Sequence, residues 1–216
     1  MAVRVSTIVV AGGSGTRFGA PKQFCDLGGV TVLDRSVALA LAASDAVCVV
    51  LPADADWTPP PGVVVAPGGA SRSESTRNGL AEIPPDTEIV VVHDAARPLC
   101  PPSLFAAVID AVAAGADAAI PGLAVSDTVK RVERGGGGDV VVGTVDRSDL
   151  VTVQTPQAFR AEVLRAAHAG GGVDTDDAAL VEAAGGRVVV VAGDPRNLKI
   201  TVADDLRIAA ALLEVS

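Results

Sequence analysis

Short β-branched runs alternate with segments of helical periodicity along this chain of 216 residues. The strand-like runs are Val3 to Val10, Ala46 to Leu51, Val63 to Ala66, Glu88 to Val92, Ala116 to Ile120 and Arg187 to Ala192. Several of them are apolar at successive positions, which is typical of strands covered by helices on both faces. The alternation therefore predicts an α/β fold with a mostly parallel central sheet.

Length and composition favour one domain. Hydrophobic residues make up 49% of the chain but aromatic residues only 2%, so the interior has to be built from closely packed Val, Leu, Ile and Ala. A chain of this length buries a sufficient core without disulfides or metals. We expect residues 1–216 to form a single domain.

The predicted helices have recognisable ends. Thr31 and Asp34 have the spacing of a capping box, and Pro102 suits a first helical turn. Gly115 and Gly185 are placed as C-terminal stops.

A β-hairpin interrupts the α/β alternation. Thr128 to Glu133 and Asp139 to Asp146 are rich in β-branched residues, and Gly135 to Gly138 lies between them. An isolated two-stranded hairpin is only marginally stable, so it has to rest on its own body or on a second subunit. We interpret residues 126–150 as an inserted arm, either an ordinary surface excursion or a dimerisation arm.

A glycine-rich loop follows the first predicted strand. It runs from Gly12 to Lys22 and carries two cations, Arg17 and Lys22, and no acid. A dinucleotide fingerprint would need glycine where Phe18 stands, and a Walker A loop would need Gly-Lys-Ser/Thr. Backbone N–H groups and these two cations can still bind a polyphosphate. The loop predicts a nucleoside triphosphate site of another design.

Other polar groups lie at predicted strand ends, where open α/β sheets bind ligands. The segment Gly68 to Leu80 enters a helix that either Ser73 or Ser75 could cap. Asp94 and Arg97 could be site residues or a surface ion pair. We assign His93 a packing or hydrogen-bonding role rather than catalysis.

Three later groups have similar alternatives. Thr155 and Gln157 could be turn residues around Pro156, and Lys199 could be a solvated residue of an extended segment. The acids of Asp174 to Asp177 are interpreted as helix caps and partners of the helix dipole rather than metal ligands.

Charge and cysteine content limit the function classes. The net charge of −9 disfavours general binding to nucleic acid or to an anionic membrane surface. The three cysteines, Cys25, Cys48 and Cys100, lack CxxC spacing, which predicts neither disulfides nor a zinc site and suits the cytoplasm. Met1 to Ala11 is too short for a signal peptide, and no apolar run reaches membrane-spanning length.

The ordered set of motifs resembles the 2-C-methyl-D-erythritol 4-phosphate cytidylyltransferase family. The motifs are Ala11-Gly12-Gly13-Ser14-Gly15-Thr16-Arg17, Pro21-Lys22-Gln23, Gly68-Gly69 with Arg72 and Ser75, Val92-His93-Asp94-Ala95-Ala96-Arg97-Pro98, Asp127-Thr128-Val129-Lys130, Thr155-Pro156-Gln157, Thr175-Asp176-Asp177-Ala178 and Asn197-Leu198-Lys199-Ile200-Thr201. They cover nearly the whole chain.

The resemblance implies a Rossmann-like nucleotidyltransferase domain and a cytoplasmic homodimer of the non-mevalonate isoprenoid pathway. Its substrates would be CTP and 2-C-methyl-D-erythritol 4-phosphate, and its products 4-diphosphocytidyl-2-C-methyl-D-erythritol and pyrophosphate. Mg²⁺ would be held mainly by the CTP phosphates, with no metal ligand assigned in the protein. No nucleic acid or membrane partner is implied.

The resemblance also assigns site residues. The catalytic cations would be Arg17, Lys22 and Lys199. CTP would be bound by Ala11, Gly12, Gly13, Ser14, Gly15, Thr16, Gly69, Ala70, Ser75, Asp94 and Ala95. The acceptor would be bound by Asp94, Arg97, Thr128, Arg147, Thr155 and Lys199, with Arg147 and Thr155 reaching across from the arm of the second subunit.

Two positions depart from the family pattern, in which alanine is frequent at Gly12 and an acid at Ala70. The alternative functions are a related pentitol-phosphate or molybdopterin cytidylyltransferase and, in other classes, a nicotinamide-dependent oxidoreductase or a catalytically inactive nucleotide-binding regulator. Phe18 disfavours the oxidoreductase. The acceptor phosphate is largely dianionic near neutral pH, so the chemistry needs cations rather than a general base.

Overall fold

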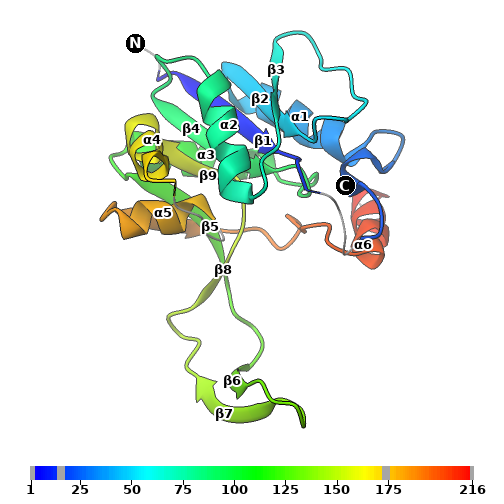
Figure 1. Ribbon diagram of the computed structural model, residues 1–216, viewed down its shortest axis with the longest axis vertical. Helices are drawn as coiled ribbons and strands as arrows, with labels where there is room; N and C mark the ends of the chain where they lie inside the picture. Colours follow the sequence, from blue (N-terminus) through cyan, green and yellow to red (C-terminus); the bar gives the residue numbers. More distant parts are fainter. Residues whose placement is uncertain (1–2, 14–17, 172–175, 215–216) are drawn as a thin grey trace.

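The computed structural model describes residues 3–13, 18–171 and 176–214. Within these ranges, eight strands form one sheet in the order β10-β5-β9-β4-β1-β2-β3, with β8 paired to β5 (Figure 1). The strands are β1 (Val5–Val10), β2 (Ala46–Leu51), β3 (Val63–Pro67), β4 (Ile89–Asp94), β5 (Ala118–Ala124), β8 (Val151–Val153), β9 (Gln157–Arg160) and β10 (Val188–Ala192).

The sheet is mostly parallel, which confirms the predicted fold class. Strand β1 pairs in parallel with β2 and β4, β2 with β3, and β5 with β10. Every residue of β4 is buried, as expected for a central strand covered on both faces. Strand β9 runs antiparallel between β4 and β5, and sequence analysis missed both it and β8. Each of these two strands has at most four residues, too few for a periodic signal.

Helices cover both faces of the sheet (Figure 1). They are η1 (Lys22–Phe24), α1 (Val32–Ala43), α2 (Arg72–Glu82), α3 (Pro102–Ala113), α4 (Ala161–Ala169), α5 (Asp177–Ala183) and α6 (Ala203–Glu214). One core cluster contains buried side chains of α2, α4 and α5, and two others contain those of α3 and α1. A fourth, smaller cluster joins Leu27, Val32, Ile200 and Ala209 and anchors α6 to the body.

The predicted helix ends are present. Thr31 Oγ1 accepts a hydrogen bond from the backbone N–H of Asp34 at 3.0 Å, which caps α1. Pro102 is the first residue of α3. Gly115 and Gly185, which follow α3 and α5, have φ angles of +111° and +84° that favour glycine.

Strands β6 (Val129–Glu133) and β7 (Val140–Val145) form the expected antiparallel hairpin as a separate two-stranded sheet. The hairpin projects away from the central sheet (Figure 1). Val140 and Val141 on it are 63% and 57% exposed. Apolar side chains on such a slender element are poorly covered by their own chain.

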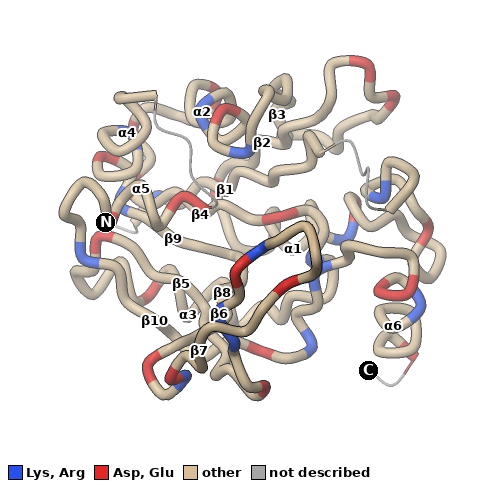
Figure 2. The backbone as a smooth tube through the Cα atoms, turned by 60° about the horizontal axis from the view of Figure 1, so that its bottom comes forward, with Lys and Arg blue, Asp and Glu red and all other residues tan. Residues whose placement is uncertain are grey.

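Charged residues of both signs are distributed over the backbone (Figure 2). Among the helices that the structure describes, none has the length and apolarity needed to cross a bilayer.

Candidate active site

Two glycine-containing loops meet at the carboxyl edge of the sheet. A Cβ atom on Gly68 would lie 3.4 Å from Gly12 Cα and 3.3 Å from the carbonyl oxygen of Leu51, so glycine allows this close approach. The loops border a cavity of about 470 Å³. It is lined by Val10, Gly12, Gly13, Gly69, Ala70, Ser71, Arg72 and Ser75. Five of the residues predicted to bind CTP are in this set.

Ser71, rather than Ser73 or Ser75, caps helix α2, because its Oγ accepts from the N–H of Glu74 at 3.0 Å. The side chain of Ser75 is thereby available for the preceding turn, and its Oγ accepts from the N–H of Gly69 at 3.0 Å. Glu74 Oε2 accepts from the N–H of Ala70 at 2.7 Å. A carboxylate therefore lies at the Gly-Gly turn although position 70 itself is alanine.

Asp94 ends β4 and is held between two cations. Its Oδ2 lies 2.6 Å from Lys199 Nζ, and its Oδ1 lies 3.3 Å from Arg72 Nε. Burial alone would raise the pKa of Asp94, but the charges of Arg72 and Lys199 outweigh it and hold the pKa well below its usual range. The carboxylate is therefore ionised at neutral pH.

Arg72 continues this charge network, and sequence analysis assigned it no role. Its Nη1 lies 2.5 Å from Asp177 Oδ2, and Asp177 Oδ1 lies 3.0 Å from His168 Nε2. Asp177 is fully buried, so these partners are needed to stabilise its negative charge. The interpretation of the acids at 174–177 as helix caps is right for Asp176, which caps α5 through the N–H of Ala179. Asp177 lies in the first turn of α5, where an acid interacts favourably with the helix dipole, and it is in addition a buried ion-pair partner of Arg72. Asp174 lies outside the described residues.

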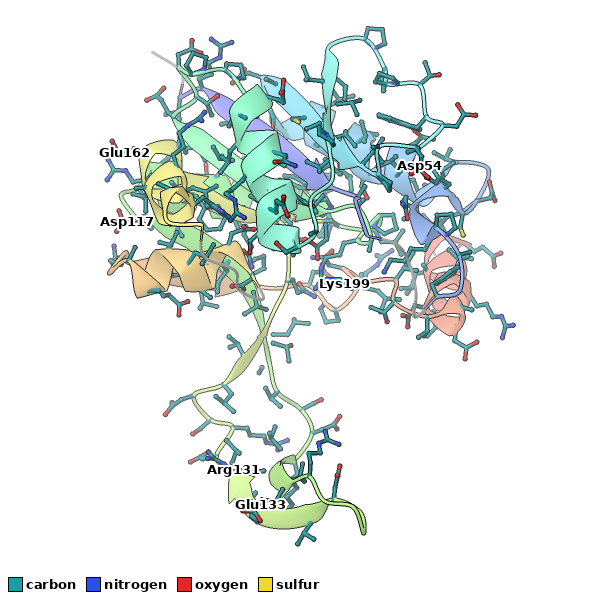
Figure 3. All side chains as sticks on the ribbon, in the orientation of Figure 1. Asp54, Asp117, Arg131, Glu133, Glu162 and Lys199 are labelled. Carbon is teal, nitrogen blue, oxygen red and sulfur yellow. The ribbon has the colours of Figure 1, made fainter. Side chains whose placement is uncertain are left out.

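Lys199 lies in the short segment between β10 and α6 (Figure 3), and Lys22 bonds to the backbone of the same segment. Lys22 Nζ donates to the carbonyl oxygen of Ile200 at 2.6 Å, and Lys199 is the residue immediately before Ile200. Two cations from opposite ends of the chain thus come to the same edge of the sheet as Asp94.

Arg97 and Thr155 lie in a buried network beside Asp94. Thr155 Oγ1 accepts from the N–H of Asp94 at 3.0 Å, and Arg97 Nη1 donates to the carbonyl oxygen of Asn197 at 2.7 Å. The expectation that Thr155 reaches across from a second subunit is wrong, because the chain returns beside β4 in β9 and leaves Thr155 buried in its own body. The ion pair considered for Asp94 and Arg97 is replaced by the bonds to Arg72 and Lys199.

His93 is fully buried, as its assigned packing role requires. Its ring centroid lies 5.1 Å from that of Phe105, and its Nε2 is 3.3 Å from the carbonyl oxygen of Arg97. Burial lowers the pKa of His93 to about 4, so the ring is neutral at pH 7.

The remaining predicted site residues divide into three groups. Ala11 and Ala95 are buried beside β1, where the N–H of Ala95 donates to the carbonyl oxygen of Val10 at 3.0 Å. Thr128 and Arg147 flank the hairpin, away from the cavity, and Arg147 Nη1 donates to the carbonyl oxygen of Ser126. Ser14, Gly15, Thr16 and Arg17 lie outside the described residues.

No group of three or more His, Cys, Asp or Glu side chains is arranged to hold a metal ion in the described ranges. Asp94 has both carboxylate oxygens engaged by cations, Lys199 on one and Arg72 on the other.

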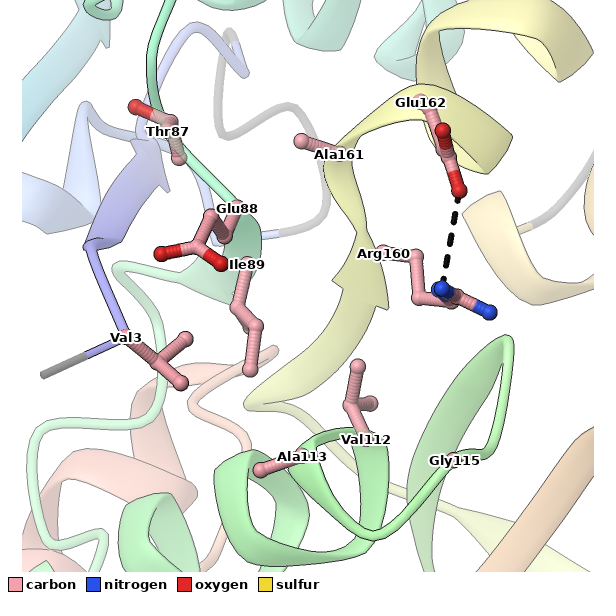
Figure 4. Close-up of a pocket in the computed structure, with 10 residues that line it drawn as sticks. All are labelled: Val3, Thr87, Glu88, Ile89, Val112, Ala113, Gly115, Arg160, Ala161 and Glu162. Carbon is pink, nitrogen blue, oxygen red and sulfur yellow. Dashed lines mark ion pairs between the residues drawn. The ribbon is translucent and has the colours of Figure 1, made fainter. Parts of the chain in front are cut away.

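A second cavity, of about 390 Å³, lies at the opposite, amino end of β1 and β4 (Figure 4). Ile89, Val112 and the ion pair of Arg160 with Glu162, 3.7 Å apart, are among the groups that line it. None of the predicted site residues borders it. Asp94, Lys199 and the cavity between the glycine-containing loops lie instead at the carboxyl edge of the sheet, where ligands bind in this fold class.

Known proteins resemble this chain over most of its length. The family model of 2-C-methyl-D-erythritol 4-phosphate cytidylyltransferase matches residues 5–215. A protein of that name from Rhodococcus jostii (strain RHA1) is 47% identical over 219 residues, covering 97% of this chain and 95% of the relative. A "Bifunctional enzyme IspD/IspF" from Clavibacter michiganensis subsp. michiganensis is also 47% identical; the match covers 97% of this chain, which spans 54% of that longer relative.

Solved structures also resemble this chain. The crystal structure of 2-C-methyl-D-erythritol 4-phosphate cytidylyltransferase from Thermus thermophilus superimposes with a TM-score of 0.83 at 36% identity, covering 99% of this chain and 100% of that one. These matches extend over nearly the whole fold, so the protein is an α/β nucleotidyltransferase.

Sequence identity places it within that class. The chain belongs to the 2-C-methyl-D-erythritol 4-phosphate cytidylyltransferase family, the enzymes of the non-mevalonate isoprenoid pathway that join CTP to 2-C-methyl-D-erythritol 4-phosphate and release pyrophosphate. This assignment displaces the oxidoreductase alternative.

Proposed function

We propose that this enzyme performs the cytidylyl transfer at the edge of the sheet where Lys22, Lys199 and Asp94 meet. A phosphate oxygen of 2-C-methyl-D-erythritol 4-phosphate attacks the α-phosphorus of CTP in line. The new P–O bond gives 4-diphosphocytidyl-2-C-methyl-D-erythritol, and the bond between the α- and β-phosphates breaks to release pyrophosphate. The observation that carries this proposal is that Lys22 Nζ bonds to the carbonyl oxygen of Ile200, the residue next to Lys199, while Lys199 Nζ bonds to Asp94.

Two mutually repelling anions have to meet in this reaction. The second pKa of the acceptor phosphate is near ~6, so its dianion is the nucleophile and no general base is required. The neutral, fully buried state of His93 is consistent with that chemistry. Arg17, Lys22 and Lys199 would neutralise the triphosphate and the five-coordinate transition state as preorganised charges.

CTP would lie in the cavity between the two glycine-containing loops. The loop from Ala11 to Arg17 would wrap the triphosphate with its backbone N–H groups. The turn at Gly69 and Ala70, together with Ser75, would bind the cytosine, and Asp94 and Ala95 would also contact CTP. The 470 Å³ cavity that five of these residues line supports this placement.

The acceptor phosphate would lie on the other side of Lys199, next to Arg97 and Thr155. Arg97 is buried next to Asp94, and its guanidinium is fixed by the carbonyl oxygen of Asn197. A fixed guanidinium can orient a phosphate with little further loss of side-chain freedom. Asp94 would also hold Lys199 in place until the phosphates are bound.

The hairpin arm would complete the site of a second subunit, making the enzyme a homodimer. Residues 126–150 then form an insertion in one domain of residues 1–216. The exposed valines of β7 support a partner, because a two-stranded hairpin needs apolar cover. Thr128 and Arg147 would reach the acceptor bound to the partner, since neither borders the cavity of its own chain.

A divalent cation, usually Mg²⁺, would enter with CTP, bound mainly by its phosphates. It would supply charge stabilisation at the triphosphate in addition to that of the lysines. We place the enzyme in the cytoplasm, which suits its free cysteines Cys25, Cys48 and Cys100. Its net charge of −9 gives no support to a nucleic acid or membrane partner.

Pyrophosphate release tests this function. Purified protein is given each of the four nucleoside triphosphates with 2-C-methyl-D-erythritol 4-phosphate, and CTP with a pentitol phosphate or molybdopterin as alternative acceptor. We expect release only with CTP and methylerythritol phosphate. Faster release with either alternative acceptor would reassign the enzyme to a related cytidylyltransferase.

A further inference from the structure

Asp205, in the first turn of α6, collects three hydrogen bonds on a single carboxylate oxygen. Its Oδ2 accepts from the N–H of Thr201 at 2.7 Å, from Thr201 Oγ1 at 2.6 Å and from the N–H of Val202 at 2.9 Å. Several donors on one ionised oxygen make a strong, directional anchor. The anchored residues directly follow Lys199 and Ile200.

Ile200 is fixed from the other side as well. Its N–H donates to the carbonyl oxygen of Ala96 at 2.8 Å. Its side chain is fully buried against Leu27, Val32 and Ala209. The segment from Lys199 to Val202 is thus held between the loop after β4 and the start of α6.

Both proposed catalytic lysines are connected to this segment. Lys199 belongs to it, and the carbonyl oxygen of Ile200 accepts from Lys22 Nζ at 2.6 Å. The charge of Lys22 also acts on Asp205. Burial alone would raise the pKa of Asp205, but the hydrogen bonds from Thr201 and Val202 and the charge of Lys22 lower it. Asp205 is therefore an anion at neutral pH, close enough to Lys22 for the charge of that lysine to act on it.

We propose that Asp205 is a positioning residue for catalysis, which orients Lys22 and Lys199 by fixing the Lys199 to Val202 segment. The inference rests on the proposed function, because it acts through the two lysines of that site. A misplacement of about 1 Å at a catalytic group can cost on the order of 10² in rate. Asp205 does not border the nucleotide cavity, so its effect would fall on kcat more than on the KM for CTP.

The neighbouring acid provides a matched control. Asp204 is in the same helical turn, but its side chain is 77% exposed and its partner is the exposed Arg207, at 3.0 Å. Asp204→Ala and Asp205→Ala replace the same residue type and remove the same atoms. Only Asp205→Ala should alter the Lys199 to Val202 segment.

The experiment measures kcat and KM for CTP by pyrophosphate release, with thermal unfolding for each variant. We expect Asp205→Ala to lower kcat by 10-fold or more, on the order of the cost of a misplaced catalytic group, with KM within about 3-fold. Asp205→Asn should lose less, because its amide oxygen can still accept. Equal kcat for Asp204→Ala and Asp205→Ala would overturn the inference.

A double-mutant cycle separates positioning from general destabilisation. In a Lys22→Ala background, Asp205→Ala should lower kcat by a clearly smaller factor, because part of its effect is exerted through Lys22. Equal factors in the two backgrounds would contradict the proposal. If Asp205→Ala does not fold, Asp205→Asn and Thr201→Val replace it in the cycle, and wild-type kcat in both would overturn the inference.

The two proposals fail differently. Absence of pyrophosphate from the wild-type enzyme with CTP and methylerythritol phosphate would remove the proposed function, and this inference with it. Normal wild-type activity together with an inert Asp205→Ala change would remove the role of Asp205 alone.

Discussion

Lys199 Nζ and Asp94 Oδ2 lie 2.6 Å apart although 105 positions separate them in the chain. The pair joins the end of β4 to the segment before α6 and places a cation at the carboxyl edge of the sheet. Asp94 stays ionised there because Arg72 stabilises it from its other side. Lys199 can therefore leave Asp94 and bind a phosphate, because the buried carboxylate still has Arg72 as its partner.

Replacement of Lys199 tests the electrostatic role assigned to it. Lys199→Ala should lower kcat by about 10²- to 10³-fold, since it removes a preorganised charge from the transition state. Steady-state pyrophosphate release provides the measurement. Arg207→Ala is the control, because this cation is 83% exposed and pairs only with the exposed Asp204 among the contacts described. A folded Lys199→Ala protein with wild-type kcat would exclude Lys199 from catalysis.

Removal of Arg72 should destabilise the fold. Arg72→Met leaves Asp177 and Asp94 buried without their shared cation, and breaking such a pair typically costs about 3–5 kcal/mol. Urea unfolding at pH 7 measures this loss. Arg207→Met, at an exposed ion pair, should cost no more than about 0.5 kcal/mol. Similar losses in the two variants would contradict a structural role for the buried network.

His93 predicts a pH dependence of stability. Its pKa is about 4 in the folded protein and about 6.5 in the unfolded chain, so below pH 6.5 the unfolded chain takes up a proton that the folded protein does not. Stability should be greatest above pH 6.5 and fall by about 3 kcal/mol as the pH approaches 4. The pKa values of Asp94 and Asp177 are lowered in the folded protein, so the stability that these two carboxylates contribute is lost in turn at more acidic pH.

The measurement is urea unfolding of wild type and His93→Gln between pH 7 and 5, where the contribution of His93 dominates. Whatever the overall stability of the variant, its free energy of unfolding should change much less across this interval. If the free energy of unfolding of His93→Gln fell with pH as steeply as that of the wild type, another group would be taking up the proton.

Mixed dimers test the shared site. Arg147→Ala and Lys22→Ala should each be inactive on their own, and co-expression should restore activity to one site of the mixed dimer. The physical reason is that Arg147 would act on the partner's acceptor, whereas Lys22 would act on the nucleotide of its own chain. Activity no higher than that of the separate variants would argue against a composite site.

Much of the fold could be predicted because several of its parallel strands, such as β2, β3 and β10, are uninterrupted runs of apolar residues. The run Ala46 to Leu51 coincides with β2, and the hairpin strands fall within the expected segments. Strands β8 and β9 were missed because they are short and lie on either side of a proline-containing turn. Their pairing is a tertiary effect that local pattern does not encode.

The same limit applies to the site. Lys22 and Lys199 were identified from motifs, and the structure brings both to one segment. Arg72 and Asp177 were not assigned to a common network, because an ion pair across 105 positions has no periodic signal in sequence. Thr155 was assigned to the wrong subunit for the same reason, since its position depends on β9 lying beside β4.

The most direct test of the account is a crystal structure of the enzyme with CTP and Mg²⁺. We expect Lys22 Nζ, Lys199 Nζ and the guanidinium of Arg17 all within about 3 Å of oxygens of one triphosphate, the distance of a charge-assisted hydrogen bond. Lys22 would then have left the carbonyl oxygen of Ile200, and Lys199 would have turned from Asp94. A triphosphate bound elsewhere, with the two lysines still on Ile200 and Asp94, would contradict the account.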